Sequence, residues 1–193
     1  MKNIKFLLAF AIIFAVSCNS DDDGFYNTKY IEATNLVTID TEPSFNVGDN
    51  LYVDAEIPNI LPESGQSTPL DIRQTTGNAP SFIFSYYIEK NTGGDTWEYV
   101  DLTGNFTAIT GSGNSGAFVE AFAEYIPFND AYLFRGAIEL TQPGNYRMSF
   151  DLNSLYPNKA SMISRSQENN ITLNISSSIA DINAQGYYFF TVN

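Results

Sequence analysis

Apolar and polar residues alternate one by one along most of this chain. Four segments show the pattern most clearly, with an apolar side chain at every second position: 51–57, 82–88, 146–152 and 171–175. Successive side chains of a β-strand point to opposite faces, so this period of two predicts strands with one buried face in an antiparallel sheet. The sequence predicts further strands at 36–40, 96–102, 106–110, 132–140 and 187–192.

Residues suited to tight turns separate these segments. Gly, Asn and Asp gather at 47–50, 92–95, 111–116 and 142–145, where they supply the positive φ angles that such turns need. About nine short strands joined in this way predict an all-β domain of two packed antiparallel sheets, a β-sandwich. We expect this domain to cover residues 31–193.

One segment, 117–126, fits both a helix and a strand. Phe118, Phe122 and Tyr125 share a helical face, whereas Phe118, Phe122 and Ile126 share a strand face. The strands expected on either side and the Gly-rich loop before it favour a strand.

The N-terminus has the pattern of a lipoprotein signal. Lys2 and Lys5 precede an apolar run at 6–16, and Ser17 and the lone Cys18 follow it. The run has about 11 residues, whereas a permanent membrane span needs about 20. We therefore expect a signal peptide at residues 1–17, removed before Cys18 receives lipid, and a mature protein anchored outside the cytoplasm.

The residues after Cys18 are polar and acidic and show no periodicity. We interpret residues 18–30 as the lipidated cysteine and a flexible tether. Asp21, Asp22 and Asp23 are adjacent and are candidates for binding a cation. A solvated, self-repelling stalk is the favoured interpretation of such a charge run.

This N-terminal region resembles that of small surface lipoproteins of the Bacteroidota. The Ser17-Cys18 pair is similar to their cleavage site, and the run Ser20-Asp21-Asp22-Asp23 is similar to their signal for export to the outer leaflet. The resemblance implies a lipid-anchored protein of the outer membrane, exposed at the cell surface.

Two further motifs resemble those of β-sandwich domains, the first of the immunoglobulin-like family and the second of many bacterial extracellular proteins. Gly144 and Tyr146 lie in a Pro-Gly-x-Tyr entry to a late strand, and Gly48 and Asp49 lie in a Val-Gly-Asp entry to an early strand. The resemblance implies that Tyr146 packs at a corner and that its hydroxyl group bonds to upstream backbone. It also implies an immunoglobulin-like form of the sandwich.

Charge and composition exclude several classes of function. The formal net charge is −13, so phosphate backbones are repelled and nucleic acid is not an expected partner. The chain has no His and one Cys, which excludes a disulfide, a Cys/His zinc site and a catalytic relay through His. We expect no metal and no cofactor.

The remaining candidates for chemistry are carboxylates. Glu120 and Glu124 point the same way on a strand, about 13 Å apart, which exceeds the 5–9.5 Å between glycosidase carboxyl groups. Asp49, Asp54 and Glu56 are near one another in sequence but are fewer than the oxygens that Ca²⁺ requires. Solvent-facing acids are the favoured interpretation of both sets, except that Asp49 is expected to cap its turn.

Aromatic residues are the most informative candidates for binding. The chain has 12 Tyr and 15 Phe. Trp97, Tyr99, Tyr87 and Tyr187 are candidates for a platform that stacks on a ligand, either a sugar or a protein. Core packing is the favoured role of any single ring, because large aromatic side chains are mostly buried.

These observations favour a non-catalytic function. Our first hypothesis is a surface lipoprotein that serves as an accessory or interaction domain for a larger outer-membrane protein. The alternative is a carbohydrate-binding lipoprotein that uses exposed aromatic rings. A hydrolase based on Glu120 and Glu124 is the third and weakest hypothesis.

Overall fold

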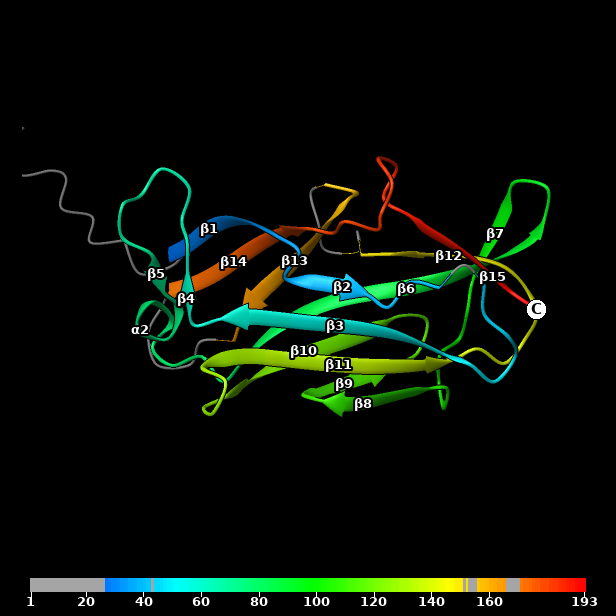
Figure 1. The fold of residues 1–193 in the computed structure, drawn as a ribbon, viewed down its shortest axis with the longest axis horizontal. Coiled ribbons are helices and arrows are strands. Elements are labelled where there is room, and N and C mark those ends of the chain that lie inside the picture. The colour runs from blue at the N-terminus through cyan, green and yellow to red at the C-terminus, as the bar shows by residue number, and fades with distance from the viewer. Residues whose placement is uncertain (1–26, 43, 151, 153–155, 166–170) are drawn as a thin grey trace, which may run out of the picture.

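The computed structural model describes residues 27–42, 44–150, 152, 156–165 and 171–193. These residues form an almost entirely β structure with one short helix, α2 (Ile72–Thr76), which confirms the all-β prediction (Figure 1). The strands are β1 (Asn27–Thr34), β2 (Val37–Ile39), β3 (Asn50–Pro58), β4 (Ile60–Leu61), β5 (Leu70–Asp71), β6 (Ser81–Gly93), β7 (Thr96–Tyr99), β8 (Phe106–Thr110), β9 (Ser112–Ser115), β10 (Val119–Ile126), β11 (Ala131–Glu139), β12 (Gly144–Ser149), β13 (Lys159–Ser164), β14 (Ile171–Ser178) and β15 (Tyr188–Val192).

The strands of the described residues number 15, more than the nine or so that the alternation predicted. The additional ones are β1 and β13, with eight and six residues, and three shorter strands. Of the shorter ones, β4 and β5 have two residues each, and β9 has the sequence Ser-Gly-Asn-Ser, with no apolar side chain. Strands of this kind show no period of two, so the pattern on which the prediction rested was absent from them.

Most of the strands form one large curled sheet. A single long strand, β6, connects two parts of this sheet. Its first half pairs with β10 and β13, and its second half pairs with β12 and β7. Strand β12 continues to β15, so β7, β6, β12 and β15 lie side by side at one end of the molecule (Figure 1). The long strand thus places a four-stranded sheet beside the rest of the fold.

Residues 27–30, which the sequence assigned to a tether, belong to β1, and the rest of the expected tether lies outside the described residues. This strand pairs with β14 along its whole length, and the pairing is parallel, whereas only antiparallel pairing was expected. Backbone hydrogen bonds make this pairing. The side chains of β1 are mostly polar, so their pattern did not predict a strand here. Only Ile31 of β1 is fully buried.

Strands β1 and β2 together join the two edges of the main sheet. Asn35, between them, has a φ of 55° and donates its backbone N–H to Ser178 O at 2.8 Å. The N–H of Glu56 donates to Leu36 O at 2.9 Å. The first bond extends the pairing with β14 and the second extends the pairing with β3, so this one segment closes the sheet on itself.

The predicted apolar faces fill the interior of the curled sheet. The side chains of Leu51, Val53, Phe82, Phe84, Met148, Leu173 and Ile175 are at most 1% exposed. The alternation predicted for residues 146–152 ends earlier, because β12 stops at Ser149 and Leu152 is 41% exposed. Four well-separated segments therefore contribute one shared core.

Segment 117–126 is largely a strand, as favoured, because β10 begins at Val119. Its core face, however, carries small residues. Ala121 and Ala123 are buried, whereas Phe118 is 45% exposed. Ala121 pairs with Phe84 of β6, whose ring already fills the space inside. Small side chains in β10 leave room for that ring.

Candidate functional site

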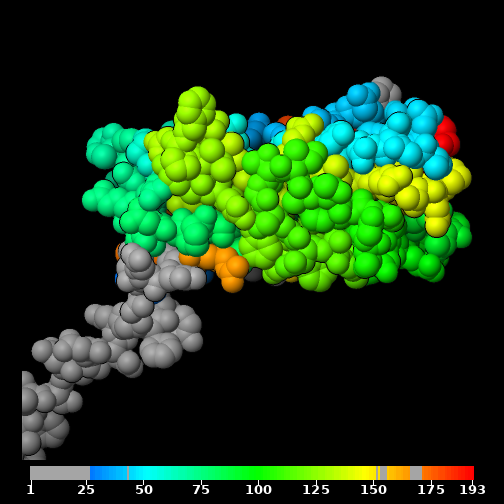
Figure 2. Space-filling model, turned by 90° about the horizontal axis from the view of Figure 1, so that it is seen from below, coloured from blue at the N-terminus to red at the C-terminus, as the bar shows by residue number. Residues whose placement is uncertain are grey.

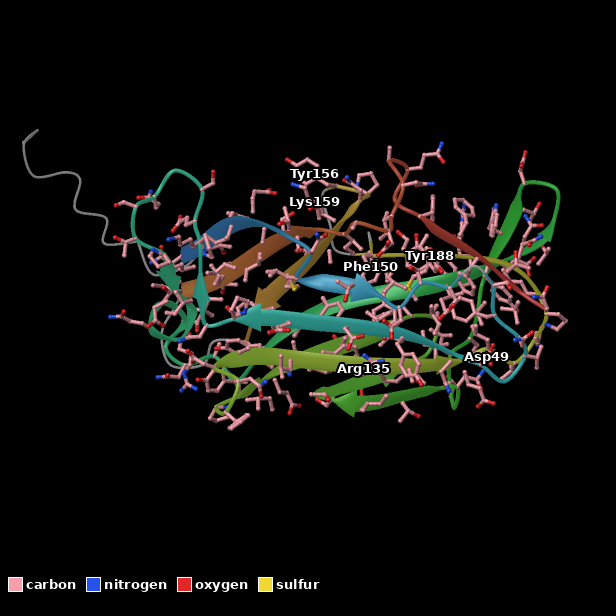
Figure 3. All side chains as sticks on the ribbon, in the orientation of Figure 1. Asp49, Arg135, Phe150, Tyr156, Lys159 and Tyr188 are labelled. Carbon is pink, nitrogen blue, oxygen red and sulfur yellow. The ribbon has the colours of Figure 1, made fainter. Side chains whose placement is uncertain are left out.

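The turn residues singled out in the sequence form two corners of the fold. Gly48 has a φ of 94°, and an Asp49 carboxylate oxygen accepts the N–H of Asn46 at 2.7 Å (Figure 3). At the other corner Gly144 has a φ of 147°, and the Tyr146 hydroxyl donates to Gln142 O at 2.8 Å. That hydrogen bond to upstream backbone is the one that the immunoglobulin resemblance implies. These residues hold the two turns in place.

The four strands β7, β6, β12 and β15 present an outer face with an ordered row of side chains. Register places Arg147 of β12 opposite both Phe189 of β15 and Glu89 of β6. Register also places Glu89 opposite Tyr99 of β7. Because directly opposite residues of a sheet lie within contact distance, the row is continuous across all four strands.

Arg147 is the centre of this row. Its Nε donates to Glu89 Oε2 at 2.5 Å, and Glu89 is only 7% exposed. Its guanidinium lies 4.0 Å from the centre of the Tyr187 ring and 4.6 Å from that of Trp97. A cation against aromatic rings is attracted by their π electrons, so the two rings and the carboxylate hold the side chain from several sides.

The surroundings of Arg147 also keep it charged. Burial disfavours the charged form, but the hydrogen bond and the negative charge of Glu89 outweigh that effect and raise the pKa of Arg147. The planar guanidinium can stack on a ring and donate to a carboxylate at the same time, which a lysine ammonium cannot do. The positive charge is therefore a permanent part of this surface.

The aromatic residues around Arg147 form a cluster that we call the aromatic platform. Tyr187 and Trp97 each contact Phe189, with ring centres 5.9 and 5.7 Å apart, and Tyr87 contacts Tyr99 at 5.0 Å. Tyr99 is 57% exposed and Phe189 is 49% exposed, whereas Tyr87 is buried and supports Tyr99 from below. The platform combines exposed rings with a fixed cation.

The structure thus brings all four predicted stacking residues to one face. Trp97 and Tyr99 come from β7, Tyr87 comes from β6, and Tyr187 directly precedes β15. Sequence reasoning did not include Phe189, Arg147 and Glu89 in the site. The alternation within β12 does place Arg147 on the outer face, away from the core residues of that strand. Only the order of the strands shows that Arg147 contacts Glu89 and the aromatic rings.

The candidate catalytic pair is engaged in hydrogen bonds with a neighbouring strand. Glu124 accepts the hydroxyl of Ser112 at 2.5 Å, and Glu120 accepts the side-chain amide of Asn114 at 3.3 Å. Both acids lie on β10, and both donors lie on β9. These contacts give the two acids a structural role at the junction of the strands.

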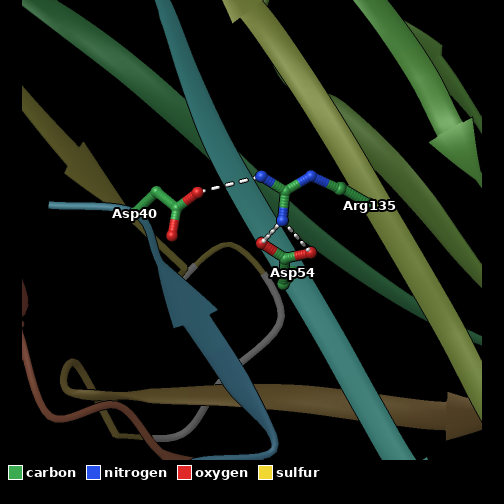
Figure 4. A network of polar contacts seen from close by, with 3 residues as sticks. All are labelled: Asp40, Asp54 and Arg135. Atoms are coloured by element: carbon green, nitrogen blue, oxygen red, sulfur yellow. Dashed lines mark hydrogen bonds and ion pairs between the residues drawn. The ribbon is translucent and has the colours of Figure 1, made fainter.

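A second charged group joins β2, β3 and β11. Arg135 donates to both carboxylate oxygens of Asp54, at 2.9 and 2.8 Å, and to Asp40 at 2.9 Å (Figure 4). Its guanidinium also lies 4.5 Å from the ring centre of Tyr52. Burial raises the pKa of Asp54 even though Arg135 acts to lower it. The two hydrogen bonds from Arg135 make Asp54 the partner of an ion pair between β3 and β11.

Asp49 and Asp54 do not converge on a calcium site, because each has its own partner. In the part of the chain that the structure describes, no three acidic, His or Cys side chains are grouped as metal ligands. The same part contains no helix that is long and apolar enough to cross a membrane. Residues 1–17, Cys18 and the export run Ser20, Asp21, Asp22, Asp23 lie outside the described residues.

Comparison with known protein families, with characterised proteins and with solved structures finds no match to this chain.

Proposed function

We propose that this chain is a non-catalytic lipoprotein of the outer membrane that binds a larger envelope protein through its aromatic platform. The observation that supports this proposal best is the stack of Trp97, Arg147 and Tyr187 on a solvent-facing sheet. In this proposal the fold is an immunoglobulin-like sandwich, and lipid on Cys18 attaches it to the membrane, exposed at the cell surface.

The composition of the platform supports a protein partner. Trp, Tyr and Arg are the residues most enriched at the energetic centres of protein interfaces. An arginine that is already held by Glu89 and two rings loses little conformational freedom when a partner arrives. The exposed rings of Tyr99 and Phe189 extend the contact area on either side.

The N-terminal sequence supports the cellular location. A basic start, a short apolar run and a small residue before Cys18 are the features that a lipoprotein signal requires. The net charge of −13 makes attachment through a basic surface unfavourable, so lipid is the anchor that fits this chain.

The test is recovery of partners from gently solubilised envelopes with the tagged, lipidated full chain. We expect a stoichiometric outer-membrane protein, and we expect the double variant Trp97→Ala with Phe189→Ala to weaken its binding by about tenfold or more. Tyr30→Ala is the matched control, because Tyr30 is 72% exposed and lies on β1, away from the platform. Recovery of the chain alone would refute the proposal.

The second candidate function is carbohydrate binding by the same platform. The observation in its favour is the exposed ring of Tyr99 beside Trp97 on an edge strand, since sugars stack on accessible aromatic faces. Binding on a glycan array that decreases with Trp97→Ala, together with recovery of the chain alone from envelopes, would favour it over the protein partner. Absence of binding to any glycan would exclude it.

A further inference from the structure

A cleft of about 570 Å³ opens beside the platform, on the side of β7 that faces away from it. It lies between the hairpin of β6 and β7 and the connection from β11 to β12. A volume of this size is in the range of sites that hold a small molecule or a few residues of a peptide.

The cleft has an apolar floor. The floor residues Ile88, Leu102, Ile138 and Leu140 are each at most 4% exposed and belong to the core. The cleft therefore reaches the edge of the core at this end of the molecule. An apolar side chain of a ligand can complete the packing here and remove its own surface from water.

The rim of the cleft carries an excess of negative charge. Glu98, Asp101 and Glu139 are exposed acids, and Lys90 is the one cation among the lining residues. The ammonium group of Lys90 donates to the side chain of Gln142 at 2.9 Å and lies 5.6 Å from the Tyr146 ring. Hydrogen bonds from Thr103 lower the pKa of Asp101, so its charge persists.

We propose that this cleft binds a short segment of the partner protein with apolar side chains flanked by Lys or Arg. The apolar side chains match the floor, and the flanking cations match the acidic rim. Tyr99 belongs both to the platform and to the cleft lining, so a partner that covers the platform reaches the cleft around β7. The inference rests on the proposed function, because it names the chemistry of that partner.

The test uses the purified full chain and three capped tetrapeptides: Lys-Leu-Leu-Lys, Glu-Leu-Leu-Glu and Lys-Gly-Gly-Lys. An NMR titration at low salt follows the amides that line the cleft. We expect Lys-Leu-Leu-Lys to bind most tightly. We also expect its affinity to decrease severalfold as the salt concentration rises. Equal affinity for the acidic peptide would overturn the charge argument, and equal affinity for Lys-Gly-Gly-Lys would overturn the role of the floor.

Variants locate the binding and separate this inference from the proposed function. We expect Glu98→Gln with Glu139→Gln to weaken binding of Lys-Leu-Leu-Lys about fivefold, as for two exposed charge pairs. The control Glu56→Gln with Glu120→Gln removes the same charge outside the cleft and leaves affinity unchanged. An unchanged affinity in the cleft variant overturns the inference, whatever the envelope experiment shows. If the platform variant loses its envelope partners and the cleft variant keeps them, the proposed function stands and the proposed role of the cleft is overturned.

Discussion

Arg147 shows what one residue contributes to this fold. Its charge is matched by Glu89, and its plane is covered by Trp97 and Tyr187. In the alternating pattern it is one polar position among several in its segment. Its importance arises because β6, β7 and the residue before β15 each deliver one partner.

Replacing Arg147 tests this role at the scale of the residue. We expect Arg147→Met to lower the free energy of unfolding by about 2–4 kcal/mol, because it leaves the nearly buried Glu89 carboxylate without its ion pair. Urea unfolding measures the change. The double variant with Glu89→Gln should recover part of the loss, since no uncompensated charge remains. An unchanged midpoint in Arg147→Met would show that the ion pair contributes nothing to stability.

At the scale of elements, β8 and β9 are inserted where β10 and β11 separate. β10 pairs with β11 near one end and with β9 farther along, while β11 pairs with β8. Segments around residues 100 to 125, drawn in green, cover much of the face in Figure 2. Gly111 joins β8 to β9 at the point where the two longer strands separate.

Gly111 is required at this fork for two reasons. Its φ is 71°, and a Cβ at this position would lie 2.4 Å from Phe122 O of β10. We expect Gly111→Ala to destabilise the fold by about 1–3 kcal/mol through backbone strain. Gly116→Ala is the control, because a Cβ there meets no atom within 4 Å. Equal denaturation midpoints for the two variants would contradict the close approach of these strands.

At the scale of the whole molecule, the chain covers the edges of its own sheet. β1 and β2 bridge the edges at β14 and β3, and Phe45 covers the edge at β15. The N–H of Phe45 donates to Thr191 O at 2.9 Å, and the N–H of Asn193 donates to Phe45 O at 2.8 Å. Covered edges limit unwanted pairing with other chains. The short edge strand β7 borders both the platform and the cleft, so the surface that we propose for partner binding lies at that edge.

Buried tyrosines make the whole fold sensitive to alkali. Burial raises the pKa of Tyr86, Tyr132, Tyr146 and Tyr188 above the usual value near 10. Above about pH 10 the unfolded chain loses these protons while the folded chain keeps them, so stability decreases as pH rises. Stability is unaffected by these groups below that range.

Absorbance at 295 nm, which reports tyrosinate, measures this effect against pH. We expect a late step that coincides with loss of β structure in circular dichroism. A gradual titration of all tyrosines near pH 10, with the fold intact, would contradict their burial.

The sequence determined the class of fold, the core faces of the main strands, the corner at Tyr146 and the four aromatic candidates of the platform. These are properties of local alternation and turn chemistry, which neighbouring residues carry. Tertiary structure alone decided that β1 begins at Asn27, that β6 serves two parts of the sheet, and that Arg147 lies between Trp97 and Tyr187. Strand order and backbone pairing bring distant segments together, and no pattern within one segment records which strand will lie beside it.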